Sequence, residues 1–194
     1  VNRELEVTSI SRTIPEQKIE GVQYAAMSIG DISTHESLVQ SADIIVGALA
    51  PRGELENQLL AIYTNIATLA AKYGKRFIVI GGFSALRPAE GAPRFAEGDD
   101  IPPQYAAEAR VMYHVLTYLE IDAPEDLDWL YVSPAATYGA HSPGEATGEY
   151  RVGGQVALFD REGVSAISGS DFALAVVDEV VKKEYSNEQI AIAY

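Results

Sequence analysis

Ser84 and Tyr105 are the candidate catalytic residues of this chain, because paired serine and tyrosine hydroxyls can exchange a proton with a substrate oxygen. A tyrosine with an ordinary pKa of about 10 is a poor acid or base unless a nearby cation lowers that pKa. The position one helical turn after Tyr105 holds Ala109 and not a lysine. Tyr105 also falls on the apolar stripe of its expected helix, which favours a packing role. The pair therefore predicts weak acid–base chemistry at most.

Other kinds of catalytic site have little support in the sequence. The chain has three histidines and no cysteine. His35, His114 and His141 have no second ligand at metal-binding spacing, so we expect no metal site, and we expect His35 and His114 to be solvated helix residues. No G-x-S-x-G turn is present, which argues against a serine nucleophile, and the lack of cysteine excludes a thiol nucleophile.

Three apolar runs are each followed by small residues. A continuous apolar run of four to six residues suits a strand buried on both faces of a parallel sheet. Ligands of open α/β sheets bind beyond the carboxyl ends of such strands, where small residues let a ligand approach the backbone. The runs with their following residues span 44–51, 77–84 and 129–136. The candidate binding residues within them are Ala48, Leu49, Ala50, Gly81, Gly82, Ser133, Pro134 and Ala135.

Strands and helices are expected to alternate through the first 135 residues, which predicts an α/β fold with a Rossmann-like, doubly wound parallel sheet. Trp129 is expected in its core. The Ser33-Thr34-His35-Glu36 sequence predicts a capping box for a short helix, and Gly74 predicts a left-handed helix end. The expected strands are 6–11, 22–28 and 190–194, together with one that starts at each of Ile44, Phe77 and Trp129. The expected helices are 33–40, 54–73, 104–120 and 168–183.

Two further segments frame the expected site. Residues 87–103 form a long loop with four prolines, and loops of this length are lids, binding segments or disordered stretches. Residues 139–194 form a C-terminal extension on the substrate side of a single domain, with short extended pieces and one helix. We expect Phe95, Tyr138 and His141 to line a second-substrate pocket.

Composition narrows the classes of partner. Fourteen basic and 28 acidic residues give a net charge of −14, which disfavours nucleic acid and anionic membranes as partners. The 194 residues suffice for one domain with a sizeable core. No apolar stretch is long enough to span a bilayer, and no signal peptide is evident. A cytoplasmic protein with a small-molecule substrate is the expectation.

The start of the sequence lacks a Gly-rich phosphate-binding turn. Dinucleotide-binding sheets usually begin with a central strand, such a turn and a helix. This chain begins with Val1-Asn2-Arg3, which resembles the end of a helix. We therefore expect roughly 20 to 25 residues, including a central strand, to precede Val1. The alternative is a compact fold that is complete as written.

Several blocks of the sequence resemble one known family over nearly the whole chain. They are residues 7–12, 30–32, 77–82, 128–136, 148–153 and 167–173. Together they are similar to the atypical short-chain dehydrogenase/reductases of the NADH-flavin reductase type, related to biliverdin reductase B. Two departures stand out: the Gly-rich turn is missing, and the Tyr-x-x-x-Lys pair of standard short-chain dehydrogenases is absent.

The resemblance implies binding of NADP or NAD, with NADP slightly favoured. It places Arg12 near the adenosine ribose, where a guanidinium can pair with a 2′-phosphate. It places Asp31 and Ile32 beside the adenine, residues 48–50 under the ribose and pyrophosphate, Gly81 and Gly82 beside the nicotinamide, and residues 133–135 past its carboxamide. The alternatives are a surface Arg12 paired with Glu16 or Glu20, and an Asp31 that only shapes a turn.

The resemblance further implies an NAD(P)H-dependent oxidoreductase that transfers hydride to a flavin or another flat acceptor. Hydride transfer between stacked rings needs little acid–base help from the protein, so the missing lysine is tolerable. A non-catalytic NAD(P)-binding sensor is the alternative. A sugar-nucleotide epimerase is disfavoured, because its chemistry needs the absent Tyr-x-x-x-Lys pair.

Overall fold

The computed structural model describes residues 4–98 and 101–194, so the helix end expected at Val1-Asn2-Arg3 lies outside the described residues. The strands are β1 (Val7–Ser11), β2 (Val22–Ala26), β3 (Ile44–Gly47), β4 (Arg76–Ile80), β5 (Asp128–Pro134), β6 (Arg151–Gly153) and β7 (Glu188–Ala193). The α-helices are α1 (His35–Gln40), α2 (Leu59–Lys72), α3 (Pro103–Ile121) and α4 (Gly169–Lys182). None of these helices is both long and apolar enough to cross a membrane.

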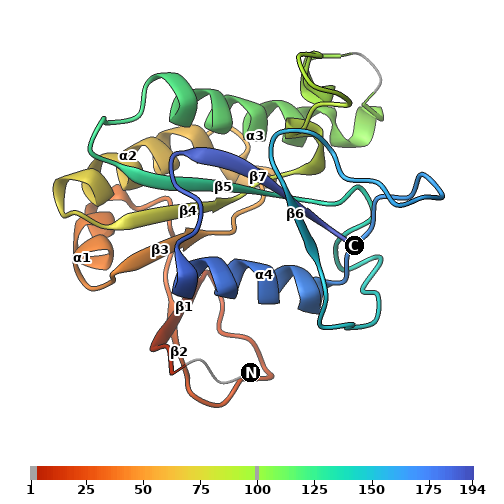
Figure 1. The fold of residues 1–194 in the computed structure, drawn as a ribbon. Helices are drawn as coiled ribbons and strands as arrows, with labels where there is room; N and C mark the ends of the chain where they lie inside the picture. Colours follow the sequence, from red (N-terminus) through yellow and green to blue (C-terminus); the bar gives the residue numbers. More distant parts are fainter. Residues whose placement is uncertain (1–3, 99–100) are drawn as a thin grey trace.

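A five-stranded sheet in the order β3-β4-β5-β7-β6 forms the centre of the molecule, and only β6 is antiparallel to its neighbour. Helices α2 and α3 cover one face and α4 covers the other (Figure 1). One core lies between β4, β5 and helices α2 and α3, and it contains Trp129 as expected. A second core lies between β4, β5, β7 and α4. The expected doubly wound α/β fold is confirmed.

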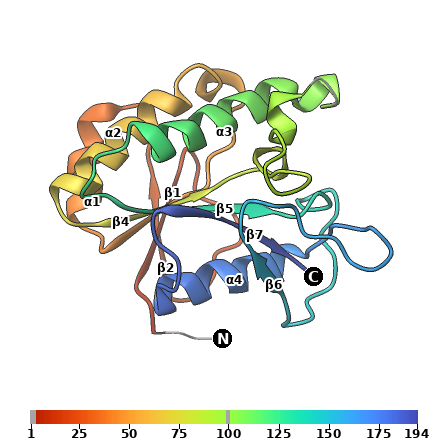
Figure 2. The same ribbon diagram turned by 45° about the horizontal axis from the view of Figure 1, so that its top comes forward.

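Strands β1 and β2 pair in parallel as a separate two-stranded sheet. This pair runs at a steep angle to the strands of the larger sheet in both views (Figures 1 and 2). Strand β3 therefore lies at an edge of the larger sheet, and its Val46 is 43% exposed. Burial of this run on both faces was expected and is wrong, because among the described residues β3 pairs with β4 alone. The strand expected before Val1 stays a prediction.

The structure contains some of the helix ends that were predicted from local sequence. Gly74 adopts a left-handed conformation with φ of 61° just after α2, as expected. Helix α2 begins at Leu59, later than expected, because Gly53–Leu55 forms a separate 3-10 turn. The expected capping box is not formed. Instead the Asp31 side chain accepts a hydrogen bond from the Ser33 amide and caps a 3-10 turn before α1.

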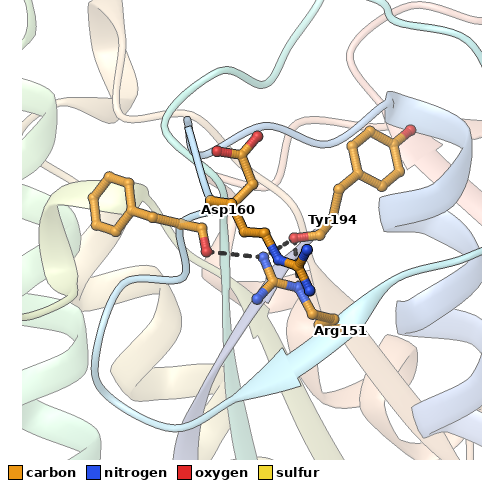
Figure 3. Close-up of a pocket in the computed structure, with 5 residues that line it drawn as sticks. Arg151, Asp160 and Tyr194 are labelled. Carbon is orange, nitrogen blue, oxygen red and sulfur yellow. Dashed lines mark hydrogen bonds between the residues drawn. The ribbon is translucent and has the colours of Figure 1, made fainter. Parts of the chain in front are cut away.

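The C-terminal residues add an antiparallel edge to the sheet. Strand β6 pairs with β7 so that Arg151 lies opposite Ala193. The Arg151 guanidinium donates hydrogen bonds to the backbone oxygens of Tyr194, at 2.6 Å, and Phe159, at 3.2 Å (Figure 3). Two other expected extended pieces form single bridges, between Val156 and Arg87 and between Ala166 and Thr137.

The buried Asp171 carboxylate fastens the segment before β6 to the start of α4. It accepts hydrogen bonds from the amides of Thr147 and Gly148, both at 2.8 Å, and from the Tyr194 hydroxyl at 2.6 Å. The hydroxyl of Ser168, the N-cap of α4, donates to it as well. These donors, the Thr147 amide foremost, hold the pKa of Asp171 far below its usual range.

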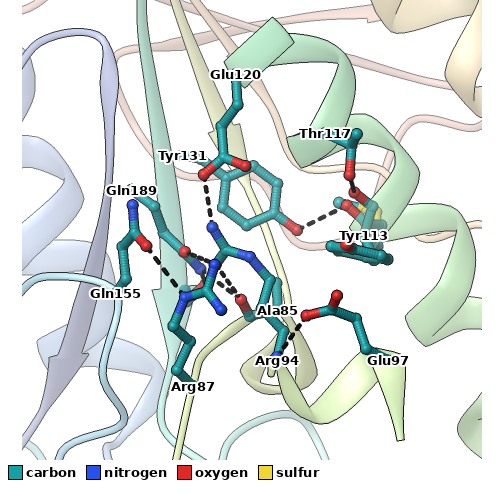
Figure 4. A network of polar contacts seen from close by, with 12 residues as sticks. Ala85, Arg87, Arg94, Glu97, Tyr113, Thr117, Glu120, Tyr131, Gln155 and Gln189 are labelled. Carbon is teal, nitrogen blue, oxygen red and sulfur yellow. Dashed lines mark hydrogen bonds and ion pairs between the residues drawn. The ribbon is translucent and has the colours of Figure 1, made fainter. Parts of the chain in front are cut away.

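The long loop after β4 is anchored by Arg94, which is 3% exposed. Its guanidinium donates to the Ala85 carbonyl at 2.6 Å, to the Glu120 carboxylate at 2.5 Å and to the Gln189 side-chain oxygen (Figure 4). Arg87 donates to the Ala92 carbonyl. Residues 87–97 are thus bound to α3 and β7, which does not fit the expected lid.

We expect Arg94→Met to destabilise the fold by about 3–5 kcal/mol, because it leaves the Glu120 and Gln189 side chains without their buried donor. Urea unfolding measures this change. Arg52→Met is the control, since the Arg52–Glu108 ion pair is exposed and contributes about 0–1 kcal/mol. Equal losses in the two variants would contradict the anchoring role of Arg94.

We expect Asp171 to make stability fall with acidification. Its folded-state pKa is depressed, so its contribution is present above the ordinary pKa near 3.8 and is lost as the pH falls below that value. Asp171→Asn should lower the melting temperature at pH 7 and flatten its decline below pH 4. Asp43→Asn, which alters an exposed carboxylate 3.7 Å from Lys75, is the control and should keep the wild-type profile.

Candidate functional site

The carboxyl ends of β3, β4 and β5 lie at one edge of the sheet, because these neighbouring strands are parallel. The strand registers place Gly47 beside Val79 and Ile80 beside Val132. The segments that leave these strands hold most of the binding residues expected from the sequence. The structure brings these together: Ala48, Leu49, Ala50, Gly81, Gly82, Ser133, Pro134 and Ala135.

Tyr63 of α2 shapes the exit of β3. A Cβ atom at Gly47 would lie 3.0 Å from the Tyr63 ring, so the glycine is what lets the ring pack here. The Leu49 amide donates to the Tyr63 hydroxyl at 3.0 Å, which fixes the turn. Leu49 is half-buried, while Ala48 and Ala50 are exposed. Burial raises the pKa of Tyr63 well above its usual value, so this hydroxyl stays neutral.

Tyr131 of β5 plays the same part at the exit of β4. A Cβ atom at Gly81 would lie 2.0 Å from the Tyr131 ring, so packing alone requires this glycine. The Tyr131 hydroxyl donates to the Met112 carbonyl at 3.1 Å, and burial raises its pKa. Gly82 differs, because the nearest atom to its added Cβ is the Ser84 hydroxyl at 3.8 Å. Of the two glycines, Gly82 is the one with room beside it.

The exit of β5 is buried at all three residues expected to bind a ligand, Ser133, Pro134 and Ala135. Ser133 is fully buried, and its hydroxyl accepts a hydrogen bond from Gln189 at 2.9 Å. Pro134 pairs with Ile192 of β7, and Ala135 is 3% exposed. Since Gln189 also contacts Arg94, the anchored loop is connected directly to this strand end.

Arg12 and Asp31 follow β1 and β2 at the same end of the smaller sheet. The Met27 amide donates to the Ser11 carbonyl at 2.9 Å, which keeps the two exits adjacent. Asp31 accepts from the Ser33 hydroxyl at 2.6 Å, which is the main reason that its pKa is lowered. Ile32 is 53% exposed. The alternative pairing of Arg12 with Glu16 or Glu20 is not formed among these described residues.

His35 joins this end of the smaller sheet to α2. Its Nε2 donates to the Ile29 carbonyl at 2.6 Å, and its Nδ1 accepts from the Asn65 amide at 2.9 Å, which requires the neutral tautomer. The expectation of a solvated His35 is wrong, because the side chain is fully buried between these two partners. Next to Ile29, Gly30 lies against Gln58, the residue before α2. This contact places Gly30, the residue before Asp31, next to the start of α2.

The catalytic pair expected from the sequence is poorly supported. Ser84 lies in a 3-10 turn after β4, and Tyr105 lies in the first turn of α3. Tyr105 is 50% exposed, so the expectation that it packs in the core is wrong: the helix begins at Pro103, and its first turn extends past the core. No hydrogen bond joins Ser84 and Tyr105, both of which are described residues.

Three phenylalanines next to the β4 exit were in part missed by sequence reasoning. Phe83 directly follows Gly82, and its ring stacks on Phe95 with centroids 5.0 Å apart. Phe159 approaches Phe83 edge-on at 6.4 Å. Only Phe95 was expected here, although the position of Phe83 after two glycines was a usable signal. Tyr138, also expected in the substrate pocket, instead packs against Phe172 of α4 at 4.7 Å.

Several solved structures of other proteins are similar to this chain in fold. A candidate exported protein from Burkholderia pseudomallei is 30% identical, with a TM-score of 0.83 over 100% of this chain and 89% of its own. A candidate epimerase from Bacteroides thetaiotaomicron is 26% identical, with a TM-score of 0.85 over 100% and 87% of the chains. A candidate NADH-flavin reductase from Streptococcus pneumoniae is 24% identical, with a TM-score of 0.79 over 97% and 87%.

The sequence also matches a family defined by NAD(P)H binding, over residues 1–180. That span includes every strand exit described above, among them both segments of the smaller sheet. With small residues at three adjacent strand ends and a match over most of its length, the chain belongs to the NAD(P)H-binding family.

Proposed function

We propose that the protein is an NAD(P)H-dependent oxidoreductase that transfers hydride to a flat acceptor such as a flavin. The observation that carries the proposal is an aromatic cluster in which Phe83, the residue after Gly82, contacts the rings of Phe95 and Phe159. Aromatic rings favour stacked or edge-on contacts with another flat ring. The similarity to a candidate NADH-flavin reductase supports the same acceptor class.

In this proposal the coenzyme lies along the strand exits. Arg12 pairs with the 2′-phosphate of NADP, Asp31 and Ile32 contact the adenine, and residues 48–50 underlie the ribose and pyrophosphate. Gly82 lets the nicotinamide approach the backbone next to Phe83, while Gly81 keeps the Tyr131 ring in place. The backbone of residues 133–135 faces the carboxamide.

The proposed hydride transfer depends on how the coenzyme and the acceptor are positioned and needs little proton transfer from the protein. Bound NAD(P)H would supply the hydride, a flavin acceptor could take its proton from water, and the protein would contribute mainly the positions of the two. The neutral tyrosines Tyr63 and Tyr131 have hydroxyls bonded to backbone groups, so they hold the strand exits in shape. We also propose a cytoplasmic location, which suits an enzyme that consumes NAD(P)H.

A second candidate function is an NAD(P)-binding sensor without turnover. The weak acid–base equipment around Ser84 and Tyr105 favours it. The relative described as a candidate epimerase raises epimerase chemistry as well, but this chain has Ala109 where the lysine of that chemistry is needed.

The deciding experiment mixes the protein with NADPH and riboflavin or FMN and follows the nicotinamide absorbance band. Saturable oxidation of NADPH that depends on both flavin and protein supports the reductase. Saturable NADPH binding without oxidation supports the sensor. Absence of both binding and oxidation would sink both candidates.

We expect Arg12→Ala to weaken NADP binding by about 10- to 150-fold, because a charge-assisted guanidinium–phosphate contact contributes about 1.5–3 kcal/mol. NAD binding should change much less, since NAD has no 2′-phosphate. Calorimetric titration with both coenzymes measures the ratio. Lys18→Ala removes a nearby exposed charge and serves as the control; an equal loss for both coenzymes in Arg12→Ala would reject this role.

A further inference from the structure

Gln189 is a buried polar residue near the start of β7, and its side chain contacts the exits of two neighbouring strands. It is 1% exposed, and the strand register places it beside Tyr131 of β5. Its Nε2 donates hydrogen bonds to the Ser133 hydroxyl at 2.9 Å and to the Ala85 carbonyl at 3.2 Å. One amide group thus contacts both the end of β5 and the turn that follows β4.

The partners of this amide fix its orientation. The Ala85 carbonyl can only accept a hydrogen bond, so it must face Nε2, whereas the Arg94 guanidinium can only donate, so it must face the side-chain oxygen of Gln189. Figure 4 shows these groups together next to Tyr131. A flipped amide would oppose two donors on one side and two acceptors on the other. The side chain therefore has one favourable arrangement, in which its donor hydrogens are directed at Ala85 and Ser133.

The turn after β4 connects this contact to Gly82. The Ala85 amide donates to the Gly82 carbonyl at 3.2 Å, so the residue bonded to Gln189 is itself bonded to Gly82. Among the described residues, the backbone ladder between β4 and β5 ends with the bond from the Gly81 amide to the Val132 carbonyl at 2.8 Å. Gln189 joins the two chain segments beyond that point, where the backbone of the sheet no longer does.

We propose that Gln189 is a positioning residue for hydride transfer, because it sets the distance between the exits of β4 and β5. The inference rests on the proposed function, in which Gly82 lies beside the nicotinamide and residues 133–135 lie beside its carboxamide. Gln189 acts through Ala85 and Ser133 and not by contact with the reacting rings. Hydride transfer between two bound rings depends steeply on their distance and orientation, so a small shift of one exit against the other slows it.

Two substitutions each remove one of the two contacts. In Gln189→Glu the carboxylate still pairs with Arg94, but it presents an oxygen to the Ala85 carbonyl in place of the Nε2 donor. Ala85 keeps its bond from Arg94 at 2.6 Å, so the turn stays attached to the fold. Ser133→Ala removes the hydroxyl at the end of β5 and changes the side-chain volume little. Circular dichroism shows whether each variant is folded, and Ser133→Ala decides alone if Gln189→Glu is not.

Single-turnover oxidation of prebound NADPH by excess FMN measures the hydride step apart from coenzyme binding. We expect each variant to slow this step by about 10- to 100-fold, the range that a displacement of up to about 1 Å can cause. The Kd of NADPH, measured by fluorescence titration, should stay at the wild-type value. Because both contacts come from one amide, the double variant should be little slower than the slower single variant.

Gln155→Glu is the matched control. Gln155 is an exposed glutamine whose side-chain oxygen accepts a hydrogen bond from Arg87 at 3.3 Å, so the same substitution again keeps an arginine partner. It should retain the wild-type single-turnover rate. An unchanged rate in Gln189→Glu and Ser133→Ala, a loss confined to NADPH affinity, or an equal loss in Gln155→Glu would overturn the positioning role and leave the reductase intact. Absence of FMN reduction by the wild-type protein would overturn both.

Discussion

The buried guanidinium of Arg94 is the interaction on which the site side of this molecule depends. A charged group with 3% exposure is tolerated only when its donors are paired, and Arg94 achieves this with partners from three elements. Those partners are the turn after β4, the C-terminal part of α3 and Gln189 of β7. Gln189 then bonds Ser133, so one network joins the long loop to the end of β5. Residues 87–97, which were expected to form a lid, are therefore held in place beside the proposed acceptor site.

Two buried tyrosines fix the shape of the chain at the exits of β3 and β4, where the coenzyme is proposed to bind. Tyr63 and Tyr131 each press a ring against a glycine and bond a hydroxyl to the backbone, at the exits of β3 and β4. Gly81 was expected from the sequence to let a ligand approach, yet packing against Tyr131 requires it, and Gly47 packs against Tyr63 in the same way. In the proposed site, the residues left accessible at these two exits are Ala48, Ala50 and Gly82, the last of which has room beside it. Such a surface positions a coenzyme without supplying acids or bases, which suits direct hydride transfer.

Sequence patterns predicted the elements well where the signal was local. The runs of β4 and β5 are buried strands, Gly74 ends a helix in the left-handed conformation, and Ser168 caps α4. The errors concern long-range neighbours. Val46 is exposed because β3 lies at the edge of the larger sheet, paired with β4. His35 is buried because its ring is hydrogen-bonded between Ile29 and Asn65. Neither fact is present in a window of sequence.

The sequence by itself determined the α/β class, the order of the elements and the family, because hydrophobic periodicity and short motifs are properties of adjacent residues. It also located the small residues at the strand exits. Only the tertiary structure decided which contacts those residues make. Gly81 makes room for the Tyr131 ring, and the Ser133 hydroxyl accepts a hydrogen bond from Gln189. Phe83, Phe95 and Phe159 come together in one cluster. Side chains from distant segments make these contacts, and the energies that select them exist only once the sheet is assembled.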